Sequence, residues 1–148
     1  IDSYAQKYFN RDDVKAAIHA NASIHWTDCS DKVDYSRADL LASMLPVYER
    51  IFELGPDLHI TIYSGLFDAI VPTPGTKLWL QALENASVIE KQGGLHTWNT
   101  PNQQIGGWTQ QYNKLNFTTI RAAGHMVPAD QPTRALYFLQ QFLRNQPL

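Results

Sequence analysis

The chain has 148 residues, of which 44% are hydrophobic and 18% charged, with a net charge of −2 at pH 7. This size and apolar content suit a folded domain with its own core and exclude a disordered or fibrous protein. Acids and bases are interspersed, so we expect no nucleic acid and no membrane among the partners. No apolar stretch approaches the roughly 20 residues that span a bilayer, and the first eight residues lack a secretory signal pattern. We therefore expect the sequence to begin on mature protein.

Two helices are predicted in the first third of the chain. Asn10 is the predicted N-cap of a short amphipathic helix with two aspartates in its first turn. Ser36 is predicted to begin a longer helix that ends at Gly55, and Pro46 is expected to kink or divide it. The apolar face of this longer helix contains Leu41, Met44, Leu45, Tyr48, Ile51 and Phe52.

The middle of the chain predicts a strand, a loop and a helix. Residues 58–64 are rich in β-branched and aromatic side chains and end at Gly65, and Asp68 lies in the loop that follows. Thr73 is predicted to begin a helix. Its predicted buried side contains Leu78, Trp79, Ala82 and Leu83.

The last third predicts short strands and a closing helix. Residues 87–107 are interrupted by paired glycines and by Pro, Asn and Gln, which is typical of turns and short strands, and a hairpin is expected near Asn113. The strand-like residues 115–122 lead directly to His125. Asp130 and Pro132 are predicted to open the final helix, whose inward face contains Ala135, Leu136, Leu139, Phe142 and Leu143.

Helices that alternate with apolar strands indicate the α/β class, and no linker or repeat divides residues 1–148 into two domains. In open parallel sheets, functional residues gather in loops at the carboxyl ends of strands. Asp68 and His125 both occupy such positions. Each residue alone is more commonly a turn or packing residue, but together they have the types and the order of a catalytic pair.

A serine nucleophile needs a base to accept its proton, and that base needs an acid to orient it. In the α/β-hydrolase arrangement the chain order is Ser, Asp or Glu, then His, which fits Asp68 and His125. No serine here has the Gly-x-Ser-x-Gly frame; Ser64 is nearest, with Gly65 alone beside it. Cys29 has no glycine turn or basic neighbour that would make it the nucleophile. We expect the serine to lie in sequence that precedes Ile1.

Residues 63–72, Tyr-Ser-Gly-Leu-Phe-Asp-Ala-Ile-Val-Pro, resemble the serine carboxypeptidase segment that carries the catalytic aspartate. Residues 122–132, Ala-Ala-Gly-His-Met-Val-Pro-Ala-Asp-Gln-Pro, resemble the same family's catalytic-histidine signature. Weaker matches occur at residues 8–10, 14–19 and 106–108. The resemblance implies an α/β-hydrolase fold, of which this chain forms the C-terminal part of a mixed, mostly parallel sheet flanked by helices. It implies a cofactor-independent enzyme that releases C-terminal amino acids from a peptide substrate through an acyl-enzyme.

The resemblance also implies partners and further site residues. Some members of the family mature into two chains, so an N-terminal chain is the expected partner, linked through Cys29. Whether two such two-chain units form a dimer stays open. Met126 is expected to border the pocket for the departing residue. One departure is Leu66, because many members have an acidic residue there, which is expected to alter the loop's hydrogen bonds and pH preference.

Three sequons, at Asn21, Asn85 and Asn116, predict glycosylation and a secretory destination: vacuolar, lysosomal or extracellular. In that compartment Cys29 would be oxidised. The remaining histidines, His19, His25, His59 and His96, lack metal-ligand spacing, so no metal is expected. Two alternatives to a peptidase stay open: a carboxypeptidase-like acyltransferase or hydroxynitrile lyase, and a non-catalytic relative that serves as a binding module.

Overall fold

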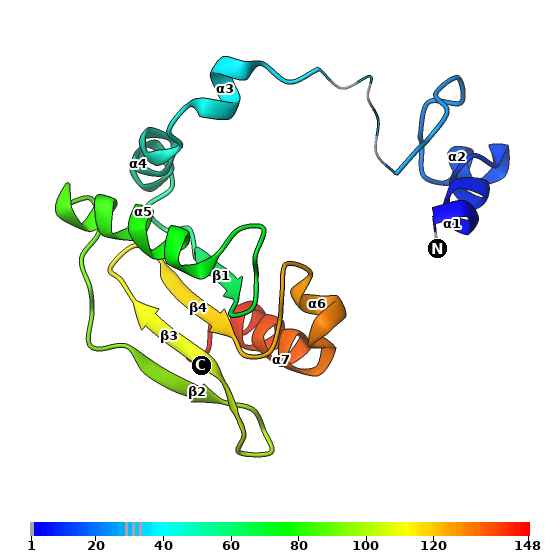
Figure 1. The fold of residues 1–148 in the computed structure, drawn as a ribbon. Helices are drawn as coiled ribbons and strands as arrows, with labels where there is room; N and C mark the ends of the chain where they lie inside the picture. The colour runs from blue at the N-terminus through cyan, green and yellow to red at the C-terminus, as the bar shows by residue number, and fades with distance from the viewer. Residues whose placement is uncertain (1, 29, 31, 33) are drawn as a thin grey trace. The chain divides into compact units, whose positions relative to one another are not determined.

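The computed structural model describes residues 1–148 except residues 1, 29, 31 and 33 (Figure 1). The chain divides into two compact units, residues 1–42 and residues 43–148. Asp68 and His125, with the strands that precede them, belong to the second unit.

The described residues of the first unit form the short helices α1 (Asp2–Phe9), α2 (Asp12–Ala17) and α3 (Arg37–Leu41). Asn10 does not cap α2, because Arg11 is the residue before that helix. The Asn10 side chain instead donates to the carbonyl of Trp26 and accepts from its N–H, both at 2.8 Å. The buried Lys15 ammonium donates to the Ile24 carbonyl at 2.8 Å. These two side chains attach the segment after α2 to the helices.

The long helix predicted from Ser36 is two helices. Ser36 caps α3 by accepting a hydrogen bond from the Asp39 N–H, and α3 then ends. A separate helix, α4 (Leu45–Leu54), has Pro46 in its first turn and ends at Gly55 as predicted. Proline lacks an N–H and fits the first turn of a helix, where that N–H has no intrahelical partner. The predicted division is confirmed.

The second unit is built on a mixed four-stranded sheet, which confirms the predicted α/β class. Its strands are β1 (Thr61–Gly65), β2 (His96–Asn99), β3 (Ile105–Gln111) and β4 (Asn116–Ile120). Their order is β1-β4-β3-β2. β1 runs parallel to β4, whereas β4 pairs with β3, and β3 with β2, in antiparallel fashion. The predicted hairpin near Asn113 joins β3 to β4 and is closed by the Tyr112 N–H, which donates to the Leu115 carbonyl.

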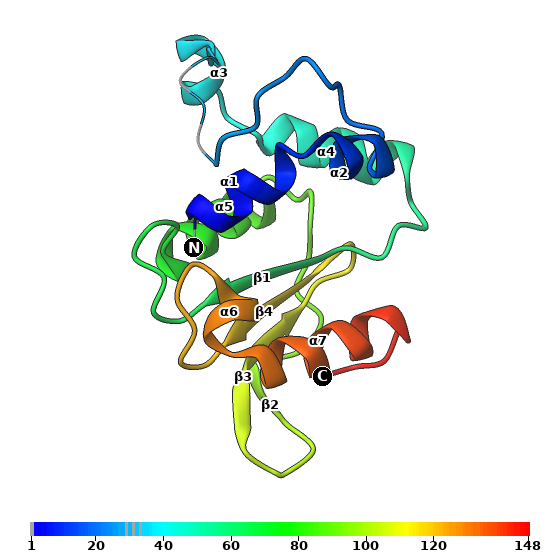
Figure 2. The same ribbon diagram turned by 90° about the vertical axis from the view of Figure 1, so that its right-hand side faces the viewer.

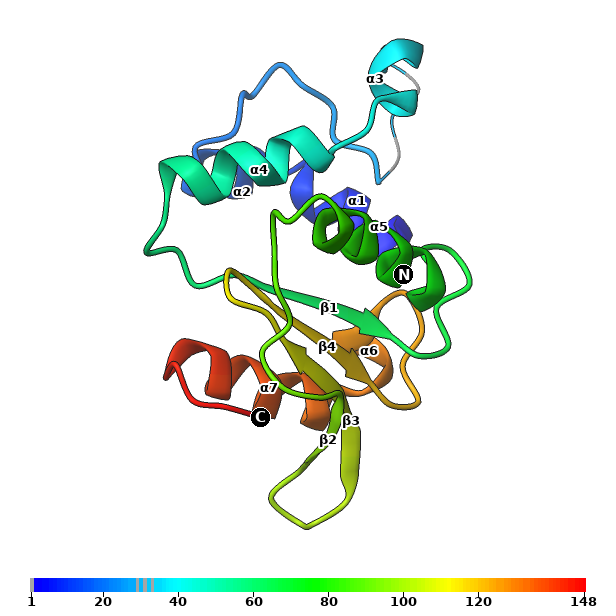
Figure 3. The ribbon, with the colours of Figure 1, turned by 90° about the vertical axis from the view of Figure 1, so that its left-hand side faces the viewer.

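Helices cover both faces of this sheet (Figures 2 and 3). On one face α4 and α5 (Thr73–Asn85) contribute to a core that contains Phe52, Leu80, Leu83 and Phe117. On the other face α6 (Val127–Asp130) and α7 (Pro132–Leu143) contribute to a core that contains Trp98, Ile120, Val127 and Phe138. The unit therefore has three layers, with the carboxyl ends of β1 and β4 at one edge.

The predicted inward faces of α5 and α7 are partly wrong. Leu83 of α5 is buried as expected, but Leu78 is 67% exposed and Leu80 is buried in its place. In α7 the buried residue is Phe138, and three of the predicted leucines are exposed: Leu136, Leu139 and Leu143. Both helices exist where the pattern predicts them, but each is rotated relative to the face that its leucines suggest.

The glycine pair at residues 106 and 107 makes room for Trp98. A Cβ atom at Gly106 would lie 2.1 Å from the Trp98 ring, and one at Gly107 would lie 1.8 Å from the Thr119 carbonyl oxygen. The indole N–H of Trp98 donates to the same Thr119 carbonyl at 3.0 Å. This contact places a large aromatic ring across β3 and β4, close to the start of the His125 loop.

Candidate active site

Two adjacent parallel strands deliver the two predicted catalytic residues to one place. β1 ends at Gly65, which pairs with Ile120 at the end of β4. Asp68 follows β1 after a two-residue turn, and His125 follows β4 in the loop before α6. Because the carboxyl ends of parallel neighbours meet at the same edge of a sheet, these loops lie side by side. The sequence reasoning about their position is confirmed.

Backbone contacts hold the two loops together. The Phe67 N–H donates to the Ala123 carbonyl at 2.8 Å, and the half-buried Leu66 donates its N–H to the Ile120 carbonyl at 3.1 Å. At Gly65 the loops touch, since a Cβ atom there would lie 2.2 Å from the Gly124 carbonyl oxygen. Only a residue without a side chain allows this approach.

The side chains of Asp68 and His125 meet directly. Asp68 Oδ2 lies 3.1 Å from His125 Nδ1. The other carboxylate oxygen, Oδ1, accepts hydrogen bonds from the N–H groups of Ile70 at 2.8 Å and Val71 at 2.9 Å. The Asp68 side chain is 7% exposed, whereas that of His125 is 53% exposed. The acid is thus fixed within its loop, and the imidazole reaches from it toward the surface.

These contacts favour the ionised form of Asp68. The Val71 N–H lowers the pKa of Asp68 most, and His125 and the Ile70 N–H lower it further, against a desolvation effect that raises it. Hydrogen-bond donors and a nearby imidazole stabilise a carboxylate more than a neutral acid. The lowered pKa favours the carboxylate form of Asp68, which is the form that can accept a hydrogen bond from His125 Nδ1.

The arrangement can support proton transfer at His125. When Nδ1 carries its proton it donates to Asp68, which leaves Nε2 as the acceptor. Within the described residues Nε2 has no hydrogen-bond partner. An exposed imidazole with an oriented Nδ1 and an open Nε2 is what a general base beside a nucleophile requires.

Sequence reasoning missed one contact in the His125 loop. Asp130 and Pro132 were predicted to open the last helix; α7 does begin at Pro132, but Asp130 is the last residue of α6. Its carboxylate instead accepts a hydrogen bond from the Gly124 N–H at 2.7 Å. An Asp shortly before a Pro, here Asp130 two residues before Pro132, is a common helix-start signal, so the residue pattern alone gave no indication of this backward contact.

The other predicted site residues fall in different places. Met126 is 67% exposed and directly precedes α6, beside His125. Asn21 and Asn85 are exposed, whereas Asn116 is half-buried in β4. Cys29 lies outside the described residues.

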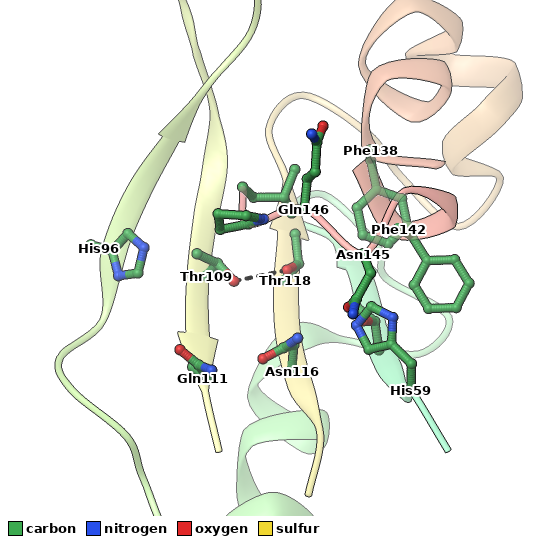
Figure 4. A pocket seen from close by; sticks show the side chains of 13 residues that line it. His59, His96, Thr109, Gln111, Asn116, Thr118, Phe138, Phe142, Asn145 and Gln146 are labelled. Atoms are coloured by element: carbon green, nitrogen blue, oxygen red, sulfur yellow. Dashed lines mark hydrogen bonds between the residues drawn. The ribbon is translucent and has the colours of Figure 1, made fainter. Parts of the chain in front are cut away.

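A cavity of about 230 Å³ lies away from this pair, between the sheet and α7 (Figure 4). Thr109 and Thr118 from the sheet form part of its wall, and their hydroxyls are 3.0 Å apart. His59 and His96 stand on opposite sides of it. Among the described residues no group of three or more His, Cys, Asp or Glu side chains could hold a metal ion.

In the described part of the chain, no helix has the length and apolar character needed to cross a membrane.

Comparisons with known proteins agree on one family. The family described as serine carboxypeptidase matches residues 1–145. Serine carboxypeptidase 24 of Arabidopsis thaliana is 41% identical over 150 aligned residues, which cover 99% of this chain and 31% of that protein. Serine carboxypeptidase-like 26 of the same plant is 39% identical, with 99% and 32% covered. The chain thus spans about a third of the length of these curated relatives.

A solved structure shows the same fold. Kex1ΔP, a prohormone-processing carboxypeptidase from Saccharomyces cerevisiae, superposes with a TM-score of 0.68 at 18% sequence identity. The superposition covers 97% of this chain and 31% of that protein. With an α/β-hydrolase fold, a family match over nearly its whole length and relatives at about 40% identity, the chain belongs to the serine carboxypeptidase family.

Proposed function

We propose that this chain forms part of a serine carboxypeptidase that removes C-terminal amino acids from peptides, and that it supplies the acid and the base of the catalytic triad. The observation that carries the proposal is the 3.1 Å contact between Asp68 Oδ2 and His125 Nδ1, on an imidazole that is half exposed. Membership of the family supports the hydrolytic chemistry.

In the proposed reaction, a serine on sequence outside this chain attacks the last peptide carbonyl while His125 Nε2 accepts the serine proton. Asp68 keeps Nδ1 protonated and stabilises the imidazolium that forms. His125 then gives the proton to the departing amino acid. Water, deprotonated by the same imidazole, hydrolyses the acyl-enzyme and restores the serine. The exposed Met126 beside His125 is proposed to contact the departing residue.

The serine and the oxyanion hole are proposed to come from an N-terminal chain of the same precursor, joined to this one through Cys29. A secretory enzyme of this kind would reside in a vacuole, in a lysosome or outside the cell. Asn21 and Asn85 are the proposed glycan acceptors, since both are exposed, while the half-buried Asn116 in β4 offers a transferase less access.

The test is Asp68→Asn in the complete protein, assayed on a blocked dipeptide with a free C-terminus. In serine proteases the equivalent change lowers kcat by about 10⁴ because the imidazole is held in the wrong tautomer, and we expect the same order here. KM should change little. Asp57→Asn, at an exposed aspartate before β1, is the matched control and should retain wild-type rates. Near-normal turnover by the Asp68 variant would disprove the assignment.

A further inference from the structure

The loop that carries His125 is closed into a ring by hydrogen bonds. At one end, the Gly124 N–H donates to Asp130 Oδ2 at 2.7 Å. At the other, the Asp130 N–H donates to the Met126 carbonyl at 3.0 Å. His125 lies between the two bonded positions. Its backbone is therefore held on both sides by the same residue, once through the carboxylate and once through the main chain.

Gln131, the residue after Asp130, binds the backbone at the start of the His125 loop. Ala122 has a positive φ of 60°, a conformation that side-chain-bearing residues adopt rarely. Its carbonyl accepts a hydrogen bond from Gln131 Nε2 at 3.0 Å, and Gln131 in turn accepts one from Arg134. Side chains at positions 130 and 131 thus fix the backbone immediately before His125, at Ala122 and at Gly124.

We propose that Asp130 is a positioning residue for the catalytic histidine: its carboxylate fixes the Gly124 peptide and so sets the direction in which His125 leaves the backbone. This inference rests on the proposed function, because it assumes that His125 is the base. It adds a residue that contacts neither Asp68 nor the substrate and acts through the loop geometry.

A positioning role differs from a stabilising one here because Asp130 is exposed. A carboxylate that accepts an N–H at 2.7 Å makes a strong, charge-assisted bond, but water competes for both partners at the surface. Loss of the bond should therefore change the thermal midpoint little. Catalysis is more sensitive, since a displacement of about 1 Å at a reacting group can lower a rate by about 10².

The contact also has little room to adjust. A Cβ atom at Gly124 would lie 3.0 Å from Asp130 Oδ2, and one at Gly65 of the neighbouring loop would lie 2.2 Å from the Gly124 carbonyl oxygen. The Gly124 peptide is thus bounded by Asp130 on one side and by the Asp68 loop on the other. Releasing it on the Asp130 side lets His125 move relative to Asp68.

The experiment compares Asp130→Ala, Asp130→Asn and the control Asp57→Ala in the complete protein. Two rates are measured for each: kcat on a blocked dipeptide, and the rate at which a fluorophosphonate labels the active-site serine. We expect Asp130→Ala to lower both rates by about 10- to 100-fold with KM within about twofold of wild type. Asp130→Asn keeps an oxygen that accepts the Gly124 N–H, so it should restore most of both rates. Asp57→Ala should match wild type.

Two results would overturn the proposal: wild-type rates in Asp130→Ala, or an Asp130→Asn variant as slow as Asp130→Ala. The labelling rate separates this inference from the proposed function, because it depends on the base and not on the substrate. A protein that is labelled but cleaves no peptide, and whose labelling depends on Asp130, would keep the positioning role and refute the peptidase. Peptide cleavage that does not depend on Asp130 would support the peptidase and refute the positioning role.

Discussion

The Asp68 carboxylate makes three hydrogen bonds, and two of the partners are in its own loop. The N–H groups of Ile70 and Val71 bind Oδ1, and His125 binds Oδ2. Since the Val71 N–H lowers the pKa of Asp68 more than His125 does, the loop itself prepares the anion. A carboxylate that is already ionised when the imidazole becomes charged can stabilise the imidazolium without itself taking up a proton.

This ordering of causes predicts the effect of removing the histidine. In His125→Ala the two backbone donors remain, so the pKa of Asp68 should still lie below the ordinary value of about 3.9. Carbon-13 NMR of the Asp68 carboxyl group across a pH titration of the complete protein measures it. A return to the ordinary value in this variant would mean that His125, and not the backbone, holds the carboxylate in its ionised form.

The same shift fixes the sign of the pH dependence. A carboxylate whose pKa is lowered on folding contributes stability that is present above the unfolded value, about 3.9, and lost as pH falls through the lower folded value. The hydrogen bonds around Asp68 are thus intact in mildly acidic solution. A loss of activity between pH 4 and 6 would have to come from another group.

The positions of Asp68 and His125 could be predicted from sequence because each follows a recognisable strand, and the structure places their side chains 3.1 Å apart. Asp130 could not, because its partner is a backbone N–H six residues earlier, which no side-chain pattern marks. The half-buried position of Asn116 was hidden for a similar reason, since the sequon pattern carries no information on burial. Residue types and their positions after strands are readable from the chain, whereas burial and contacts between a side chain and a backbone N–H are not.

At the scale of elements, the site depends on how closely the loops after β1 and β4 approach. Gly65 is the point of contact, where a Cβ atom would lie 2.2 Å from the Gly124 carbonyl oxygen and 2.5 Å from that of Ala123. Both obstacles are backbone atoms, which cannot rotate away as a flexible side chain could. Any side chain at position 65 must therefore separate the two loops.

Gly65→Ala tests this contact. We expect a loss of about 1–3 kcal/mol in the free energy of unfolding, as for other insertions into tightly packed sites, together with a lower kcat. Gly75→Ala is the control, because nothing lies within 4 Å of its added Cβ atom and alanine is favoured over glycine in a helix such as α5. Denaturant unfolding and peptide hydrolysis measure both effects. Equal behaviour of the two variants would show that the approach of the loops is not tight.

The positions of helices and strands were largely predictable, but the faces of α5 and α7 were not. The leucine pattern of α7 selects Leu136, Leu139 and Leu143, whereas Phe138 is the residue buried against the sheet. Aromatic side chains bury more area than leucine and take precedence when a helix can turn only one side to the core. The exposed leucines then form a second apolar side that hydrophobic periodicity alone could not assign.

Across the whole molecule, apolar side chains remain exposed in numbers that suit an incomplete fold. Leu78 on α5 and Leu143 on α7 are 67% and 72% exposed, and Leu136 and Leu139 on α7 are also exposed. Among the described residues, β1 pairs on one edge only, with β4. Parallel strands are normally covered on both faces and paired on both edges, and unpaired edges promote association. This chain spans about a third of the length of its curated relatives. We propose that the N-terminal chain proposed as its partner covers these surfaces.

The last prediction follows from this exposed surface and from the partner proposed at Cys29. Native material should have a mass well above 16.8 kDa without reductant and release this chain when reduced. The released chain should show no cooperative thermal transition and should bind a hydrophobic dye, because large exposed apolar patches are otherwise covered in soluble proteins. The unreduced material, run in parallel, should unfold cooperatively. A sharp transition in the separated chain would mean that the two helical layers around the sheet suffice for stability, and that the exposed leucines serve a partner gained after folding.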